Sequence, residues 1–585
     1  MDRTRRRYLR LCAAGSGLLL AGCSGQPPGD DDDDPSTTDP SGSPGGPSTD
    51  EKIDDWQYDP DERVETVSKN ATGAPGGTAT YSVTLDASQE LGFAAGGAKN
   101  VAAFRRNLED GYLPLPESLA YEGLFYNYYF DTGESGACDS LFCPSYSTAV
   151  TEDPLGEETE RYFTVGLNSN LTTESFDRKQ LNVVIVLDIS GSMSAQFNQY
   201  YYDRFGNRHE VEDADESRSK MDVAKDALVA LTEQLNPEDR LGIVLFNRDA
   251  SVAKPLRRVE ATDMDAIRTH IREDVLAGGG TNIAAGMEQA AELLGEYSDA
   301  DQTETETRQI VVTDAMPNTG QTDDQALEER LSGYAADTIH TSFVGVGVDF
   351  NPVLVDQITA VRGANYRAVH SAEDFETYLG EEFEYMVTPL VYDLDVELDA
   401  EGYDIAKVYG STAAEEATDD LLTVNTLFPS PESEGETRGG VVLVRIDKVS
   451  ENGEMTLRAS WEDRAGSTGE TTKTIAFPEE SPEFFANSGI RKAVLLSRYA
   501  DLLKNWLVYE REPERVATDD GIEIPPGEDV LSEWEQQSQP LTVTEPYDAR
   551  ISQFSEYFES EMQAIGDDEL SQELEAMSTI LAAAE

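Results

Sequence analysis

Apolar runs and amphipathic stretches alternate through the middle of this sequence, from about residue 180 to residue 382. The short apolar runs are typical of buried strands, and the stretches between them show helical spacing of apolar positions. This alternation predicts an α/β doubly wound (Rossmann-like) domain over residues 179–387, with a parallel sheet and helices on both faces. Strands are expected at Val183–Leu187, Leu241–Phe246, Ile310–Thr313 and Thr341–Val348, and helices at Met221–Leu235, Ile283–Leu294 and Ala372–Met386.

The segments on either side of this domain follow other patterns, and a chain of 585 residues is too long for a single core. Residues 75–178 predict an α+β N-terminal domain, with a strand at Thr78–Leu85 and a helix at Lys99–Leu108. Residues 483–585 carry broad apolar faces at helical spacing and predict a helical C-terminal region. Residues 388–482 predict a β-rich domain, with strands at Val391–Leu398, Gly440–Val449, Met455–Trp461 and Thr471–Phe477. We therefore expect a multidomain protein.

A dense aromatic stretch, Tyr121–Phe130, lies in the N-terminal segment. Such a stretch could form a platform for carbohydrate, but aromatic side chains more often fill a core. We interpret it as core.

The first residues of the chain are typical of an export signal rather than of folded structure. Arg5 and Arg6 resemble the pair of a twin-arginine motif, and the apolar stretch Leu11–Leu20 leads into a sequence like a lipobox at Cys23. We expect a signal peptide over residues 1–22 and lipidation of Cys23, which would anchor the protein on the extracellular face of the cell membrane. The alternative is a twin-arginine signal followed by a chance cysteine. Residues 23–74 are acidic and rich in Pro, Gly and Ser, and predict an extended tether.

The charge of the chain is strongly negative throughout. Acidic residues number 114 and basic residues 44, which gives a net charge of −70. A dispersed negative surface keeps a protein soluble where salt screens its self-repulsion. We interpret it as halophilic adaptation, with ordinary acidity as the alternative. The charge argues against nucleic-acid binding, which needs basic patches.

Two cysteines remain after the signal and the lipidation site. Cys138 and Cys143 lie close together, and in an exported protein they predict a disulfide. A zinc site is the weaker alternative, because no His lies beside them. Asn70 and Asn170 lie in glycosylation sequons.

Three short fragments of the central domain bring together only hard oxygen ligands. Asp188 and Asp314 each follow a predicted buried strand, and Ser190, Ser192 and Thr281 supply hydroxyls. Because α/β sheets place their ligand sites at the carboxyl ends of parallel strands, we expect these side chains to meet. Two carboxylates with hydroxyls and water suit Mg²⁺, or another hard divalent cation such as Ca²⁺ or Mn²⁺.

These fragments, Asp188-Ile189-Ser190-Gly191-Ser192, Gly280-Thr281-Asn282 and Thr313-Asp314, resemble the metal-ion-dependent adhesion site (MIDAS) of the von Willebrand factor A domain. The resemblance implies that Ser190, Ser192 and Thr281 are hydroxyl ligands and that Asp188 and Asp314 act directly or through water. It also implies an open coordination position that accepts an acidic side chain of a partner.

Three further features accompany this resemblance. Ala315 stands where the family usually has Gly, and an insert between Ser194 and Ser219 is expected to form a hairpin beside the metal. The flanks resemble, more weakly, the domains around the A domain of microbial surface proteins. The whole organisation resembles a haloarchaeal surface lipoprotein.

We expect a non-enzymatic, Mg²⁺-dependent protein-binding module whose ligand is a protein with an exposed Asp or Glu, and which meets the membrane only through its lipid anchor. One alternative is a metal-assisted hydrolase. The site lacks a candidate base, because the four histidines are scattered along the chain; His209, in the insert, is the one that could approach the metal. The other alternative is a structural assembly module whose metal braces the loops.

Overall fold

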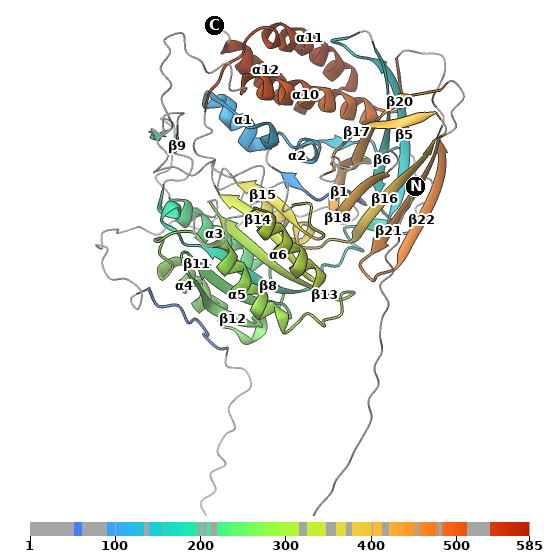
Figure 1. The fold of residues 1–585 in the computed structure, drawn as a ribbon. Coiled ribbons are helices and arrows are strands. Elements are labelled where there is room, and N and C mark those ends of the chain that lie inside the picture. Colours follow the sequence, from blue (N-terminus) through green and yellow to red (C-terminus); the bar gives the residue numbers. More distant parts are fainter. Residues whose placement is uncertain are drawn as a thin grey trace, which may run out of the picture. The chain divides into compact units, whose positions relative to one another are not determined.

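The protein is described from a computed structural model, drawn as a ribbon in Figure 1. Several predicted features lie outside the residues that the structure describes. They are the signal peptide, the expected strand Thr78–Leu85, and the residues Cys23, Asn70, Cys138 and Ala315. No helix within the described ranges is long and apolar enough to cross a lipid bilayer. The structure describes residues 52–60, 90–99, 101–133, 140–156, 158–195, 200–202, 208–210, 219–314, 324–346, 359–369, 377–400, 402–411, 421–450, 455–475, 477, 483–511 and 539–583.

A seven-stranded sheet forms the centre of the predicted α/β domain (Figure 1). Its order is β12-β11-β8-β13-β14-β15-β2, and only β12 runs antiparallel to its neighbour. The chain passes from β8 to β11 on one side and later to β13 on the other, so the carboxyl end of β8 is a topological switch point. The strands are β2 (Ala98–Lys99), β8 (Gln180–Asp188), β11 (Arg240–Phe246), β12 (Ala250–Arg258), β13 (Thr305–Thr313), β14 (Ile339–Val346) and β15 (Asn365–Val369).

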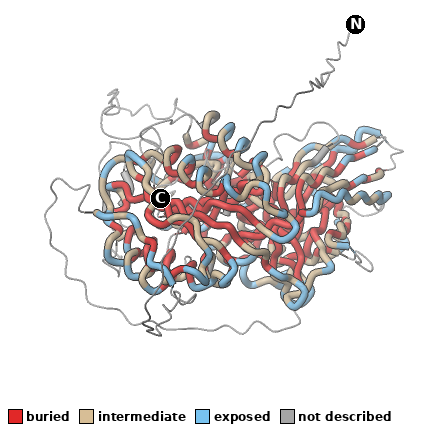
Figure 2. Tube along the Cα trace, turned by 90° about the horizontal axis from the view of Figure 1, so that it is seen from below, coloured by how far each residue is buried: buried red, intermediate tan, exposed pale blue. Residues whose placement is uncertain are grey.

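Helices cover both faces of this sheet. Successive side chains of β8 point to opposite faces, and Val183 packs in a core with α3 (Lys220–Glu233) and α4 (Met264–Glu273). Val184 packs on the other face with α5 (Ile283–Gly295) and α6 (Asp324–Ala336). Figure 2 shows the buried residues, in red, running through the interior of the molecule. The expected doubly wound domain is therefore present.

Two antiparallel sheets form a sandwich from the segments that precede and follow this domain in the sequence. Phe93, Val165, Val396 and Val444 belong to the core between them. The first sheet has the order β22-β21-β16-β18-β1-β7 with β19 and β4 attached, and the second β17-β20-β6-β5-β23. The strands are β1 (Glu90–Ala95), β4 (Tyr129–Phe130), β5 (Cys143–Glu152), β6 (Thr159–Asn168), β7 (Leu171–Thr172), β16 (Val391–Ala400), β17 (Tyr403–Tyr409), β18 (Leu421–Ser433), β19 (Glu436–Arg438), β20 (Val441–Lys448), β21 (Met455–Asp463), β22 (Thr468–Ile475) and β23 (Phe484–Phe485).

Helices pack on the outer face of the second sheet. Tyr162 of β6 and Leu443 of β20 share one core with Trp506 and Ile551 from the C-terminal helices. The aromatic stretch Tyr121–Phe130 lies largely in this core, so its interpretation as core is confirmed. The helices are α1 (Val101–Glu109), α2 (Tyr121–Tyr126), α10 (Ser488–Glu510), α11 (Tyr547–Ile565) and α12 (Ser571–Ala582), with a short α9 (Phe383–Met386) before the sandwich strands.

The pairing of the flanking strands differs from the expected arrangement of separate domains. Segments 75–178 and 388–482 contribute strands to the same two sheets, since β1 pairs with β18 and β6 pairs with β20. The short β2, from the N-terminal segment, even extends the central sheet beside β15. Alternation of apolar residues shows that a strand has a buried face, but not which strand lies beside it. The two segments are therefore interleaved, while the exact boundaries stay predictions.

Part of the predicted tether is also bound to the folded protein. Ile53 forms a parallel bridge with Thr262, and the Gln57 N–H donates to the Ala253 carbonyl. The Trp56 ring stacks on His270 with 5.4 Å between the ring centres. An aromatic side chain can bury enough area to order a few residues of an otherwise polar segment. The expectation of an extended tether up to residue 74 is therefore wrong for residues 53–57.

Candidate metal centre

The two predicted acidic ligands lie at the ends of neighbouring parallel strands. Asp188 is the last residue of β8, and Asp314 directly follows β13. The register pairs Val312 with Leu187, which brings both carboxylates to the same edge of the sheet. Asp188 is 0% exposed and Asp314 is 2% exposed. The strand pattern alone therefore brings two acidic groups into one buried corner.

A continuous chain of hydrogen bonds joins four of the predicted residues. The Ser190 N–H donates to Asp188 Oδ1 over 2.7 Å. The hydroxyls of Ser190 and Ser192 lie 2.9 Å apart, and Ser192 Oγ donates to Asp314 Oδ1 over 2.9 Å. Asp188, Ser190, Ser192 and Asp314 thus form one oxygen cluster.

The fifth predicted residue, Thr281, reaches the site on a separate loop. This loop is hydrogen-bonded to the serine loop, since Gly278 N–H donates to the Ile189 carbonyl over 2.7 Å and Gly191 N–H donates to the Gly279 carbonyl over 3.0 Å. Thr281 is 1% exposed and directly precedes the cap of α5. Gly279 has φ 98°, a conformation that favours glycine. The serine loop and the Thr281 loop are therefore joined through their backbones, and the Ser192 side chain joins Asp314 to them.

Asn247, at the end of β11, holds this loop from the other side. Its side-chain amide donates to the Gly278 carbonyl over 2.8 Å, and its backbone carbonyl accepts from the Asn282 N–H over 2.7 Å. Asn247 is not among the residues predicted from the sequence. A polar residue directly after a buried strand, at the same sheet edge as Asp188, was the available signal.

Burial and like charge act together on Asp188. Removal from water and the charge of Asp314 raise the pKa of Asp188 to about 7, although Thr313 and Ser190 donate hydrogen bonds to its carboxylate. Thr313 Oγ1 lies 2.6 Å from Asp188 Oδ2. Two buried carboxylates that repel each other favour the binding of a cation.

The chain itself supplies one cation to this corner. Lys220, the first residue of α3, places its Nζ 3.0 Å from Asp314 Oδ2, and its side chain is 3% exposed. This residue is not among those predicted from the sequence, because the insert separates it from the serine motif. A lysine at the start of a helix gives no local signal of such a role.

The donor set fits a hard divalent ion. Carboxylate and hydroxyl oxygens are ligands that Mg²⁺ accepts, and Mg²⁺ needs few protein carboxylates because it keeps several waters. Within the described ranges no group of three or more His, Cys, Asp or Glu side chains gathers as a metal site. A site of two carboxylates completed by Ser190, Ser192 and Thr281 is compatible with that finding. The divalent ion would share its corner with the Lys220 ammonium group.

Other predicted features near the site are only partly described. The insert does form a hairpin, with β9 (Tyr200–Tyr202) antiparallel to β10 (Arg208–Glu210). The side chain of His209 lies outside the described residues. Of the two histidines with described side chains, His270 bonds to Asp54 and Asp274, and His340 bonds to Glu306. Neither ring therefore bonds to a predicted metal ligand.

The predicted disulfide and glycosylation sites are also only partly described. Cys143 is disulfide-bonded, and because Cys138 lies outside the described residues, their pairing stays a prediction. Asn170 is exposed between β6 and β7, where a sequon would be accessible. Its glycosylation also stays a prediction.

The chain resembles known proteins mainly in its central domain. Residues 183–316 match the model of the von Willebrand factor type A domain. An inter-alpha-trypsin inhibitor heavy chain H4 from Homo sapiens is 22% identical over 240 residues, 40% of this chain and 22% of the relative. Heavy chain H3 from Pongo abelii is 24% identical over 37% of this chain and 22% of the relative. The chain thus spans less than a quarter of the length of these curated relatives.

Solved structures to which the chain is similar include a von Willebrand factor type A protein from Catenulispora acidiphila. It has a TM-score of 0.39 and 16% identity, over 64% of this chain and 82% of that one. An ArnB paralog from Sulfolobus acidocaldarius has a TM-score of 0.36 and 12% identity, over 76% of this chain and 97% of that one.

The family match and the sheet topology agree on the central domain. This multidomain chain contains a von Willebrand factor A domain. Domains of this family commonly bind a divalent metal, typically mediate protein–protein interactions, and are generally not enzymes.

Proposed function

We propose that this protein is a lipid-anchored cell-surface protein that binds an acidic side chain of a partner protein through Mg²⁺. The observation that carries the proposal is the oxygen cluster of Asp188, Ser190, Ser192 and Asp314, with the Thr281 loop hydrogen-bonded to it. Ser192 is half-buried and the other three residues are buried. When bound, the ion would supply an electrophilic position for an oxygen from outside the chain.

The ligand set supports an acidic partner. With the ion bound, the two carboxylates would balance its charge, and the Lys220 ammonium group would leave a net positive charge that attracts a further carboxylate. The surface of the chain is strongly acidic, with a net charge of −70. A protein carboxylate would therefore approach against long-range repulsion, which molar salt screens. We expect partner binding to need both the ion and high salt.

Surface location rests on the sequence at Arg5, Arg6 and Cys23. Export and lipidation would place the domain outside the cell, with residues between Cys23 and the bound segment 53–57 as the leash. Mass spectrometry of the mature N-terminal peptide for covalently bound lipid, compared with a Cys23→Ser variant, tests this part of the proposal. A lipid-free Cys23 in the membrane-exported protein would contradict it.

A structural role for the metal is the second candidate. Asp188 and Asp314 are almost completely buried, which would also suit an ion that only joins the loops. The two roles differ in what metal removal changes. A bracing ion changes only stability, whereas a binding ion also changes capture of a partner.

The functional test is capture of surface proteins from the native cells by the purified full-length protein in molar salt. We expect a partner to be retained with Mg²⁺ and released by chelator, and expect Asp188→Ala to abolish capture without unfolding the protein. Asp299→Asn is the matched control, because Asp299 is an exposed acidic residue in a turn of the same domain. Capture that ignores both chelator and Asp188→Ala would refute the adhesion role. A melting temperature that falls on chelation, without any captured partner, would favour the bracing role.

A further inference from the structure

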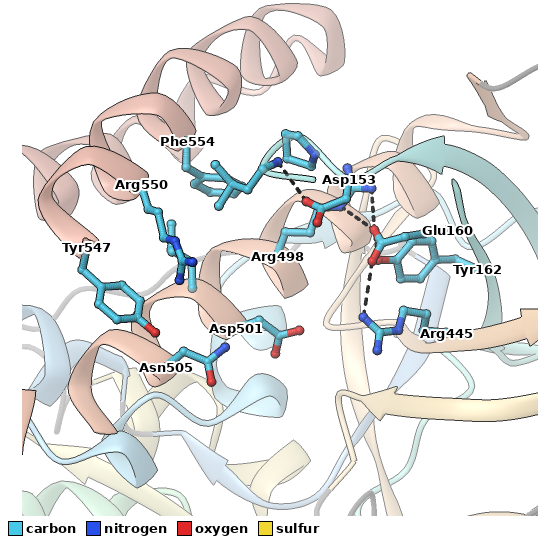
Figure 3. A pocket seen from close by; sticks show the side chains of 13 residues that line it. Asp153, Glu160, Tyr162, Arg445, Arg498, Asp501, Asn505, Tyr547, Arg550 and Phe554 are labelled. Carbon is cyan, nitrogen blue, oxygen red and sulfur yellow. Dashed lines mark hydrogen bonds and ion pairs between the residues drawn. The ribbon is translucent and has the colours of Figure 1, made fainter. Parts of the chain in front are cut away.

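A hollow of about 350 Å³ lies far along the chain from the metal centre, between the second sheet of the sandwich and the C-terminal helices. Its walls come from the turn after β5, from β6 and β20, and from α10 and α11 (Figure 3). This volume lies within the range of small-molecule sites. The hollow shares no residue with the metal centre.

The hollow is unusual for this chain because arginines gather in it. Arg445, Arg498 and Arg550 line one small space, although acidic residues outnumber basic ones by 114 to 44 in the sequence. Two of them share a single acid. Glu160 accepts from Arg498 Nη2 over 2.7 Å and from Arg445 Nη1 over 3.3 Å. This carboxylate is therefore fully engaged.

The second acid in the wall, Asp501, is engaged as well. Its Oδ1 accepts from Lys407 Nζ and from the Tyr121 hydroxyl, both over 2.6 Å. Its Oδ2 accepts from the Tyr409 hydroxyl over 2.9 Å. Asp153, the third, accepts from the Leu155 N–H of its own turn over 2.9 Å. Among the residues that line the hollow, three arginines balance three carboxylates. Lys407 does not line the hollow, but it bonds to Asp501 and adds one positive charge to this region.

Some donors in the hollow lack an acceptor in the part of the chain that the structure describes. The buried Nε of Arg445 has no hydrogen-bond partner there. Arg550 is exposed and makes a ring contact with Tyr547, 5.5 Å from the ring centre, but no ion pair with a described acid. Figure 3 shows the two guanidinium groups on opposite sides of the hollow. A buried donor without a partner favours a ligand with acceptor oxygens.

Part of the remaining wall of the hollow is apolar, and Asn505, Tyr162 and Tyr547 complete it. Leu155, Leu502 and Phe554 line it beside the charged groups. An arginine fork matches a carboxylate in two hydrogen bonds, and the excess of one positive charge matches a monoanion better than a dianion. The apolar wall would cover the carbon body of the same ligand.

We infer that this hollow binds a monocarboxylate with an apolar body. Its carboxylate lies between Arg445 and Arg550, and its apolar body lies against Leu155, Leu502 and Phe554. Such a ligand could be a free organic acid or the C-terminal residue of a peptide, since both present the same chemistry. This second site is independent of the metal centre.

The test uses calorimetry on the full-length protein in molar salt with chelator present, so that a carboxylate cannot bind through a metal. The probes are 3-phenylpropionate, its primary amide, and a short peptide ending in Phe with either a free or an amidated terminus. We expect the acid to bind at least about tenfold more tightly than the amide, because the amide loses the charged hydrogen bonds. Binding of the free acid alone identifies a small-molecule site, and binding of the acid-terminated peptide extends it to chain ends.

Variants test whether the acid binds in this hollow. Arg550→Gln should weaken the acid about tenfold with no change in melting temperature, since Arg550 is exposed. Arg458→Gln, which changes an exposed arginine on β21, is the matched control. Asp188→Ala should leave acid binding unchanged. Equal binding of acid and amide, absence of acid binding at millimolar concentration, or unchanged binding by Arg550→Gln would each overturn the inference.

Discussion

At the level of single residues, Lys220 is the feature that most affects how the metal centre would behave. Its ammonium group lies 3.0 Å from Asp314 Oδ2 in a buried site. It partly neutralises the two carboxylates when no divalent ion is bound, and it repels an ion that enters. We therefore interpret Lys220 as a group that stabilises the metal-free domain and lowers its affinity for metal.

Replacement of Lys220 by Met tests this interpretation, because Met keeps the shape of the side chain without its charge. The metal-free variant should be less stable by about 3 kcal/mol or more, since a buried charge loses its partner. Its Mg²⁺ affinity should rise at least about tenfold, because one positive charge is removed from the site. Thermal unfolding with and without Mg²⁺ measures both effects. Lower affinity together with unchanged metal-free stability would contradict the interpretation.

The sequence predicted some residues of the site and missed others for a physical reason. Asp188, Ser190 and Ser192 lie within one short motif, so their chemistry is visible locally. Lys220 and Asn247 reach the same corner from other elements. Their roles depend on which strands and helices lie side by side, and apolar periodicity does not encode that.

At the level of elements, the loop before α5 depends on one backbone conformation. Gly279 has φ 98°, and a Cβ added there would lie 3.1 Å from the Asn247 side-chain nitrogen. A Cβ added at its neighbour, Gly278, would meet no other atom within 4 Å. The loop therefore tolerates a side chain at one of two adjacent glycines.

These two positions form a matched pair of variants. Gly279→Ala should cost about 1–2 kcal/mol of stability, because a left-handed backbone is unfavourable for Ala, and it should also weaken Mg²⁺ binding by displacing the Thr281 loop. Gly278→Ala should change neither quantity appreciably. Chemical denaturation and Mg²⁺ titration of both variants give the comparison. Equal effects at both positions would show that the loop conformation is unimportant.

The strands and helices were predictable where the signal lies within one segment, and less so where it depends on distant segments. The apolar runs at Val183–Leu187 and Leu241–Phe246 became β8 and β11. The alternation predicted a parallel sheet with helices on both faces, but not the order of the strands in it. The sandwich was less predictable, because its sheets interleave segments on both sides of the A domain.

At the level of the whole molecule, a buried ion cluster joins the A domain to the sandwich. Glu306 of β13 bonds to Arg308 over 2.8 Å and to Arg464, which follows β21, over 3.0 Å. His340 lies 2.8 Å from the same carboxylate. Burial opposes ionisation of Glu306, but the charges of His340, Arg308 and Arg464 outweigh it and lower its pKa to about 2.

This cluster predicts a specific loss of stability in acid. Because the pKa of Glu306 is lower in the folded state, its contribution is present above about pH 4.5 and is lost as the pH falls towards 2. Glu306→Gln should destabilise the protein by about 3–5 kcal/mol near neutral pH, because it leaves buried arginines without a counter-ion. The free energy of unfolding of this variant should also fall less steeply in acid than that of the parent. Glu304→Gln, two residues away and exposed, is the control. Denaturant unfolding between pH 2 and pH 7 measures these effects. Free energies of unfolding for Glu306→Gln that match those of the parent at every pH would contradict the role of this cluster.

Calorimetric titration of Mg²⁺ into the chelator-treated full-length protein in molar salt tests whether the oxygen cluster binds one divalent ion. We expect one Mg²⁺ per chain, with binding lost in Asp188→Asn, weakened in Ser190→Ala and retained in Asp299→Asn. Absence of Mg²⁺ binding to the parent protein, or equal binding by Asp188→Asn, would contradict this expectation.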